Sequence, residues 1–191
     1  LLVLGRRRAG SGGGRIHVAG DLAGGGLASS ASFCVGLARV LVALGILQAL
    51  RGEGLARLAQ EVEHAFVGVP CGLMDPLAVV FGRSAGAVAI DCARGEVRPV
   101  PLAWGDRVLL ALRSGDDRRL AAEAYGRRRQ ELAAGLAGLG LATDRMPPRT
   151  VPGGLSAADA PGRRVRHVIT EQARVEAALA AAEAGDWTAF G

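Results

Sequence analysis

The 191-residue chain contains no lysine and no asparagine, so all 23 of its basic residues are arginine. Without lysine, it can carry neither a Walker-type phosphate loop nor a lysine Schiff base to a substrate or to pyridoxal phosphate. Arginine in place of every lysine is typical of high-GC coding, so the net charge of +5 is weak evidence for a nucleic-acid partner. Aromatic residues make up only 4% of the chain, which argues against a stacking surface for single-stranded nucleic acid.

Cysteines and long apolar runs are also scarce. Cys34, Cys71 and Cys92 are odd in number and unrelated in spacing, so they predict neither a disulfide framework nor a zinc site. The longest apolar run, residues 33–50, is interrupted by an arginine, which favours a buried helix over a membrane span. The start of the sequence does not resemble a signal peptide, because its short apolar run precedes its arginines. We expect a cytoplasmic monomer with no nucleic-acid or membrane partner.

Half of the residues are hydrophobic and 21% are charged, a composition that can bury a core. Helix-like and strand-like segments are mixed along the chain, which predicts an α+β or α/β fold. Asp75 before Pro76 predicts a helix capped by Asp75, and Gly185 predicts a helix C-cap. We expect helices over residues 30–50, 55–66, 117–139 and 163–184, and strands over residues 15–19, 87–92, 96–102 and 107–112.

A glycine turn, GGGLASSAS at residues 24–32, precedes the first apolar helix. Glycines let backbone N–H groups point at a phosphate with no Cβ in the way, and a helix N-terminus adds positive partial charge. The hydroxyls of Ser29 and Ser30 suit a phosphate oxygen or Mg²⁺. A glycine-rich connector with serine caps explains the segment equally well, so both interpretations stay open at this point.

The stretch EVEHAFVGVPCGLMD at residues 61–75 holds two carboxylates, Glu63 and Asp75. Taken alone, Glu63 is explained as a solvated helix residue and Asp75 as a helix cap. We expect His64 to be a packed structural histidine. We expect Cys71 to be a small buried residue, because nothing in the sequence around it supplies a base.

These two stretches resemble the galactokinase branch of the GHMP sugar and metabolite kinases. The glycine turn is similar to a P-x-G-x-G-L-S-S-S-A-S loop, with Asp21 in place of proline and Ala28 in place of the first serine. Residues 61–75 are similar to A-E-H-x-F-x-G-x-P-C-G-I-M-D-Q, and Pro76 stands where that pattern has glutamine. Segments around Tyr125 and near the C-terminus resemble galactokinase segments as well.

The resemblance implies a role for each of these residues. The residues that would wrap the phosphates of ATP are Gly24, Gly25, Gly26, Leu27, Ala28, Ser29 and Ser30. Ser30 and Glu63 would bind Mg²⁺, while Asp75 would take or orient the proton of the sugar hydroxyl. Gly72, Asp75 and Tyr125 would contact the sugar, although Tyr125 is also explained as a half-buried aromatic on its helix. The implied cofactors are ATP and Mg²⁺, and the implied partner is galactose or a similar monosaccharide.

The implied fold is the two-lobed GHMP kinase fold of the α+β class. Residues 1–105 would form part of a ribosomal S5 domain 2-like N-lobe, and residues 106–191 part of a ferredoxin-like C-lobe. A G-R-x-N-L-I-G-E-H-T-D-Y motif is missing from the first part and a T-G-G-G-F-G-G motif from the second. The chain therefore resembles a galactokinase truncated at both ends.

The implied activity of the parent enzyme is ATP-dependent phosphorylation of the anomeric hydroxyl of galactose to galactose 1-phosphate, the kinase step of the Leloir pathway. One alternative is a related sugar 1-kinase acting on N-acetylgalactosamine or arabinose, because the missing first motif shapes the sugar pocket. Another is a non-catalytic or decayed galactokinase-like fragment. Loss of the arginine in that first motif would cost about 10³-fold or more in rate.

Overall fold

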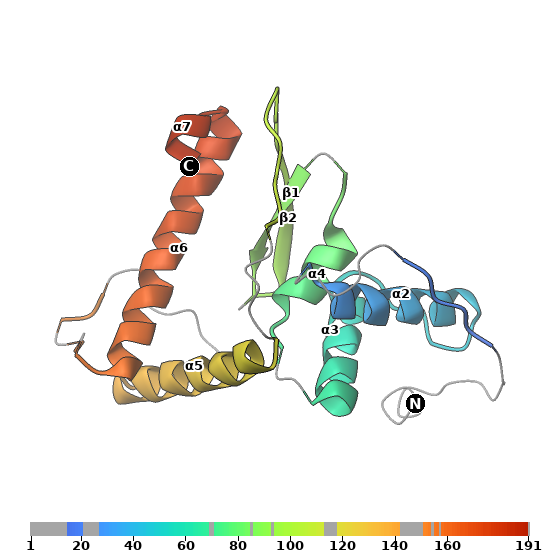
Figure 1. Ribbon diagram of the computed structural model, residues 1–191, viewed down its shortest axis with the longest axis horizontal. Coiled ribbons are helices and arrows are strands. Elements are labelled where there is room, and N and C mark those ends of the chain that lie inside the picture. The colour runs from blue at the N-terminus through green and yellow to red at the C-terminus, as the bar shows by residue number, and fades with distance from the viewer. Residues whose placement is uncertain are drawn as a thin grey trace. The chain divides into compact units, whose positions relative to one another are not determined.

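The computed structural model describes residues 15–20, 27–68, 71–84, 86–92, 94–112, 118–141, 151–153, 155–156 and 158–190. The chain forms two compact units, one made of Leu1–Ser84 with Ile90–Pro99 and the other of Ala85–Ala89 with Val100–Gly191. Helices and a two-stranded sheet together give the mixed α+β class that the sequence predicts (Figure 1). Within the described ranges, no helix is long and apolar enough to span a bilayer.

Helix α3 (Gly52–Val62) supplies buried side chains to two hydrophobic clusters of the first unit, and it contacts both α2 (Ser29–Ala43) and α4 (Met74–Phe81) (Figure 1). The first cluster consists of Cys34, Val35, Ala38, Leu47, Leu55, Leu58 and Ala59. The second cluster consists of Ala56, Leu73 and Leu77. Because apolar residues of α3 recur three or four positions apart, this helix can pack against both α2 and α4.

Two helix ends differ from the sequence predictions. The first predicted helix ends early, at Ala43, because Gly45 adopts a left-handed φ of 70°. The second continues past Val62 as a π-helix, η1 (Glu63–Val67), which ends at Gly68 with a φ of 71°. That helix was expected over residues 55–66, but α3 already begins at Gly52, and its wider last turn was not predicted.

The prediction that Asp75 caps a helix is wrong. Helix α4 begins two residues earlier than predicted, at Met74, and Leu73 occupies the N-cap position without a side-chain hydrogen bond. The first helical hydrogen bond joins the Leu77 N–H to the Leu73 carbonyl at 3.0 Å. Pro76 therefore lies inside the first turn, where no N–H is required, and the Asp75 carboxylate is not used as a cap.

Strands β1 (Gly86–Asp91) and β2 (Glu96–Pro101) form the two-stranded sheet, and both were predicted. The other two predicted strands are wrong. Residues 15–19 and 107–112 have no strand pairing in the part of the chain that the structure describes. The leucines of the second segment are 73–89% exposed. A β-strand needs a neighbouring strand to accept its backbone hydrogen bonds, and the described chain supplies none to either segment.

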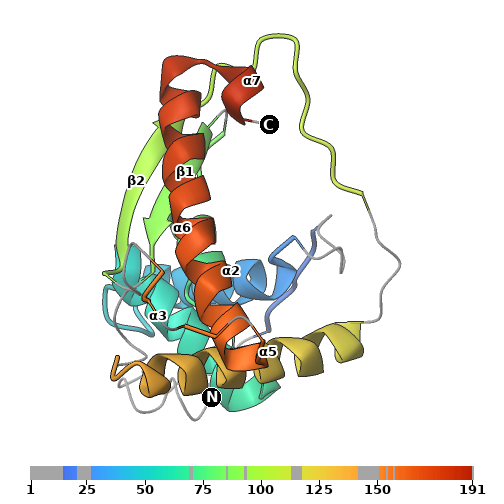
Figure 2. The same ribbon diagram turned by 90° about the vertical axis from the view of Figure 1, so that its left-hand side faces the viewer.

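In the second unit, α5 (Arg118–Gly138) packs on α6 (Ala160–Ala184) (Figure 2). Leu136, Val165 and Ile169 form the buried cluster between them. Their close approach requires Gly135, because a Cβ there would lie 2.7 Å from the Pro161 carbonyl oxygen. Both helices confirm predicted segments, and Gly185 is the predicted C-cap, with a φ of 70°.

Three aromatic residues hold the short helix α7 (Trp187–Phe190), which the sequence did not predict. The rings of Trp104 and Trp187 stack with their centroids 5.2 Å apart, and Phe190 meets the edge of Trp187 at 5.3 Å. The Arg107 guanidinium lies 5.4 Å from the centroid of the Trp187 ring.

Replacing Leu58, which is fully buried in the first cluster, with alanine should destabilise the protein by about 2–5 kcal/mol, because the substitution leaves a cavity. Chemical denaturation measures this free energy of unfolding. Leu44→Ala is the matched control, since Leu44 is 67% exposed and its loss should change the free energy by less than about 0.5 kcal/mol. Equal effects of the two variants would contradict the assigned core.

Candidate functional site

The first element of the site is the N-terminus of α2. Ala28 precedes the helix with a left-handed φ of 54°, which is rare for a residue with a Cβ, and its carbonyl accepts the Ser32 N–H at 2.9 Å. Ser29 is half-buried and Ser30 is exposed in the first turn. The first N–H groups of a helix lack helical acceptors, so this end suits an anion. The predicted phosphate-binding residues Gly24, Gly25 and Gly26 lie outside the described residues.

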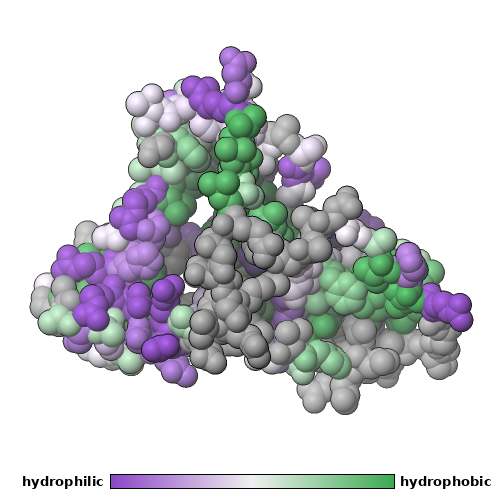
Figure 3. All heavy atoms as spheres, in the orientation of Figure 1, coloured by the Kyte–Doolittle hydropathy of each residue, from purple (hydrophilic) through white to green (hydrophobic). Residues whose placement is uncertain are grey.

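A cavity of about 540 Å³ lies beside this helix end, between residues 15–20 and α2. Its apolar lining includes Ile16, Val18 and Phe33, and Ser29 and Ser32 add hydroxyls. Figure 3 shows hydrophobic side chains gathered over α2. The sequence did not predict this cavity, because its lining comes from two separate segments and Ile16 and Val18 remain largely exposed.

Glu63 is the second element, and it begins the π-helix at the end of α3. It is only 6% exposed, whereas the sequence suggested a solvated residue. Its Oε2 accepts a hydrogen bond from the Cys71 thiol at 3.3 Å, and among the residues described no arginine or histidine forms an ion pair with it. A buried carboxylate with no cationic partner is costly, which makes this group suited to a cation.

Glu63 faces the helix that carries the serines. Helix α2 contacts η1, and burial together with the negative charge of Glu63 raises the pKa of the Cys34 thiol on α2. Cys34 follows Ser30 by one helical turn, so both belong to the same face of α2. The structure thus brings the helix bearing Ser30 and the helix end bearing Glu63 together in one unit.

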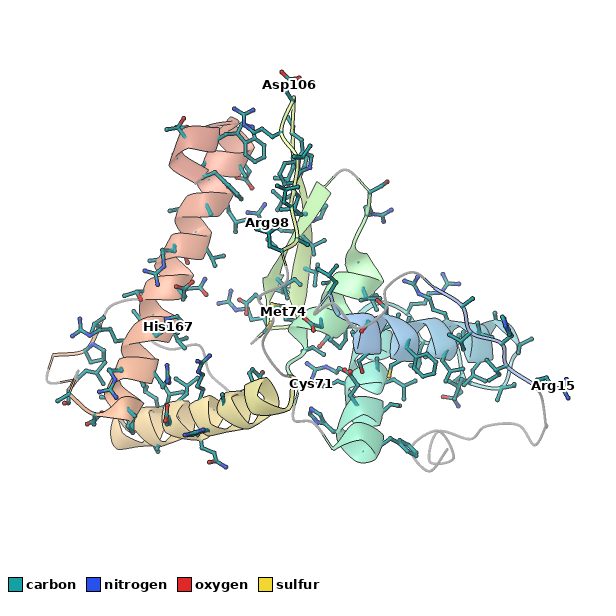
Figure 4. All side chains as sticks on the ribbon, viewed as in Figure 1. Arg15, Cys71, Met74, Arg98, Asp106 and His167 are labelled. Atoms are coloured by element: carbon teal, nitrogen blue, oxygen red, sulfur yellow. The ribbon has the colours of Figure 1, made fainter. Side chains whose placement is uncertain are left out.

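The loop at Cys71 and Gly72 is the third element, and it precedes Asp75 in the first turn of α4 (Figure 4). The Cys71 carbonyl accepts hydrogen bonds from Gln60 Nε2 at 3.2 Å and from His64 Nε2 at 2.9 Å. His64 is exposed and tethers this loop, so the prediction of a packed histidine is wrong. The Asp75 side chain is exposed to solvent, and its carboxylate forms no hydrogen bond or ion pair within the described parts of the chain.

Tyr125 lies on α5 in the second unit and is 42% exposed. Its assignment to the sugar stays a prediction, as do the sugar contact of Gly72 and the division of the chain into lobes at residue 105. The structure groups Ser29, Ser30, Glu63 and Asp75 in the first unit.

The donor set fits Mg²⁺ better than a metal held by protein alone. Across the described residues, no three His, Cys, Asp or Glu side chains are placed to hold one metal ion. Mg²⁺ is usually held by one or two side-chain oxygens together with substrate phosphates and water. A buried Glu63 beside the serine-bearing helix supplies oxygen donors of that kind.

The three thiols should differ in reactivity, because only the thiolate is nucleophilic. Cys71 is half-buried and not the fully buried residue that the sequence predicted. Burial, then the hydrogen bond to Glu63, raises the pKa of Cys71 to about 12, which disfavours its thiolate. Cys92 is exposed and Cys34 is buried.

At pH 8, iodoacetamide should label Cys92 at least ~10-fold faster than Cys71, as followed by mass spectrometry of the peptides. Rapid labelling of Cys71 that persists in the Cys92→Ser variant would contradict this order.

Comparison with known proteins identifies relatives of the chain. Residues 2–83 match the model of the GHMP kinases N terminal domain. A galactokinase of Roseiflexus sp. is 40% identical over 181 residues, an alignment that covers 88% of this chain and 44% of the relative. A galactokinase of Chloroflexus aggregans is 34% identical over 186 residues, with the same coverage of each chain.

The crystal structure of Lactococcus lactis galactokinase complexed with galactose matches the fold with a TM-score of 0.70 at 24% identity. That match covers 90% of this chain and 46% of the crystallised one. The sequence relatives and the solved structure therefore agree that the similarity extends over about nine tenths of this chain and less than half of each relative. The chain is thus similar to galactokinases over nearly all of its length and to the GHMP kinases N terminal domain at residues 2–83, and it spans less than half the length of these relatives.

Proposed function

We propose that this chain is part of an ATP-dependent kinase that phosphorylates the anomeric hydroxyl of galactose to galactose 1-phosphate. The observation that carries the proposal is the contrast between two carboxylates joined through one loop. Glu63 is buried without a cationic partner beside the serine-bearing helix, whereas Asp75 is exposed in the first turn of α4. Phosphoryl transfer needs one carboxylate for the metal and one for the attacking hydroxyl.

ATP would bind with its phosphates at the N-terminus of α2, where the free backbone N–H groups of the first turn and the hydroxyls of Ser29 and Ser30 provide donors. The apolar cavity beside Ser29 would accept the flat face of the base. Ser30 and Glu63 would hold Mg²⁺, which when bound neutralises charge on the transferred phosphoryl group.

Asp75 would accept or orient the proton of the anomeric hydroxyl as that oxygen attacks the γ-phosphorus. The bond from the γ-phosphorus to the bridging oxygen breaks, and ADP leaves with the electron pair. Asp75 is exposed and has no ion pair among the described residues, so its carboxylate is accessible to a sugar. The resemblance to galactokinases assigns Gly72 and Tyr125 to the sugar. The name of the crystallised relative, complexed with galactose, supports galactose as the sugar.

Asp75→Ala should lower kcat at least ~10²-fold, because the hydroxyl loses its proton acceptor. Galactose-dependent ADP release is measured with and without the substitution in two proteins. One is the 191-residue chain, and the other is a chimera in which this chain replaces the matching part of the Roseiflexus galactokinase. Asp106→Ala, at an exposed turn of the second unit, is the control. Near-normal turnover of Asp75→Ala would reject the role of Asp75 as proton acceptor. If the chimera is inactive even when it carries the unsubstituted chain, a decayed fragment is favoured instead.

Glu63→Gln should raise the Mg²⁺ concentration needed for half-maximal nucleotide binding by ~10-fold, because the amide keeps the shape of the side chain but loses its charge. Calorimetric titration with ADP at several Mg²⁺ concentrations measures this requirement. Glu96→Gln, an exposed residue of β2, is the matched control and should leave it unchanged. An unchanged Mg²⁺ requirement in Glu63→Gln would rule out its metal role.

A further inference from the structure

Cys71 makes three contacts with one turn of helix, and these contacts link the two carboxylates of the site. Its thiol donates to Glu63 Oε2 at 3.3 Å, and its carbonyl accepts from Gln60 and His64. We propose that Cys71 is a positioning residue: its thiol orients the Glu63 carboxylate for the cation, and its backbone fixes the loop that leads to Asp75. The proposal rests on the metal role proposed above for Glu63.

The three partners of Cys71 share one face of the helix. Residues 60, 63 and 64 are spaced by three and four positions, so their side chains project from the same side of the α3–η1 junction. The loop crosses this face of the helix. The Cys71 thiol contacts Glu63, and the Cys71 carbonyl contacts Gln60 and His64 on either side of it in the sequence. A shift of the loop would therefore move the hydrogen-bond donor of Glu63 at the same time.

The thiol engages only one oxygen of Glu63. Of the groups that the structure describes, none donates a hydrogen bond to the other oxygen, Oε1. Glu63 is 6% exposed, so rotation of its carboxylate is restricted by packing as well as by the thiol. A donor on one oxygen leaves the second as the oxygen for a cation, and it sets the plane of the carboxylate before the cation arrives.

The same loop sets the start of helix α4. Cys71 precedes Asp75 by four residues, and between them Leu73 is buried in the second cluster with Leu77. The carbonyl of Cys71 is therefore held at one end of this short connection, and the Leu73 side chain is held near the other. These two anchors position the backbone from which the Asp75 carboxylate projects.

Cys71→Ala removes the donor, and Cys71→Ser keeps a hydroxyl donor, so the pair separates hydrogen bonding from packing. The experiment measures ADP binding to the full 191-residue chain by calorimetry while Mg²⁺ is varied. Cys71→Ala should raise the Mg²⁺ concentration for half-maximal binding about 5- to 10-fold, as expected for loss of a hydrogen bond to a charged group. Cys71→Ser should stay within about 2-fold of the native chain, and so should the control Cys92→Ala.

A second measurement needs no nucleotide. Amide hydrogen exchange at residues 72–75 should quicken at least ~5-fold in a Gln60→Ala, His64→Ala double variant, because the carbonyl of Cys71 loses both donors. Exchange in α6 of the second unit serves as the internal reference and should be unchanged. Unchanged exchange at residues 72–75 would overturn the loop-fixing part of the proposal.

The outcomes distinguish the two proposals. If Glu63→Gln raises the Mg²⁺ requirement but Cys71→Ala does not, Cys71 has no positioning role and the metal role of Glu63 stands. If Cys71→Ser is impaired as much as Cys71→Ala, packing explains the effect and the orienting hydrogen bond is rejected. If Glu63→Gln has no effect, the proposed metal role fails, and the orienting role of Cys71 fails with it.

Discussion

The packing of helix α3 against α2 and α4 is the constraint on which the candidate site depends. Leu55, Leu58 and Ala59 join the first cluster, and Ala56 joins the second, so the helix cannot rotate without exposing one of them. Because α3 is fixed in this way, the π-helix that extends it has a set direction, and Glu63 is buried beside α2. The hydrophobic core thus determines where a charged group lies.

The two carboxylates have different surroundings although they are only twelve positions apart in the sequence. Glu63 lies in a buried pocket where its one observed side-chain partner within the described residues is a thiol, while Asp75 is exposed at the start of a short helix. Low polarity strengthens the attraction between a buried carboxylate and a cation, and exposure keeps the other carboxylate accessible to a sugar. The proposed kinase activity needs this difference, since one group would hold a metal and the other would meet the substrate.

Much of the fold was predictable because its signals are local. Helix α6 follows an apolar stripe at helical spacing, the αL glycine at 185 ends it, and the hairpin strands follow short β-rich segments. The strands expected at residues 15–19 and 107–112 were not found, because strand formation depends on a partner that the described chain does not provide. Asp75 before Pro76 predicted a cap, but the helix begins two residues earlier, at Met74, where the buried side chains of Leu73 and Leu77 anchor its first turn.

The sequence by itself determined the family resemblance and the residue types of the site, because glycines, serines and carboxylates in a fixed order are properties of the chain. Only the tertiary structure decided that Glu63 is buried, that Cys71 donates to it, and that a cavity lies beside Ser29. Burial and hydrogen bonding depend on which helices pack together, and those contacts join residues that are far apart in the sequence. The chemistry of each side chain is therefore encoded locally, whereas its environment is set by the packing of α3 with α2 and α4.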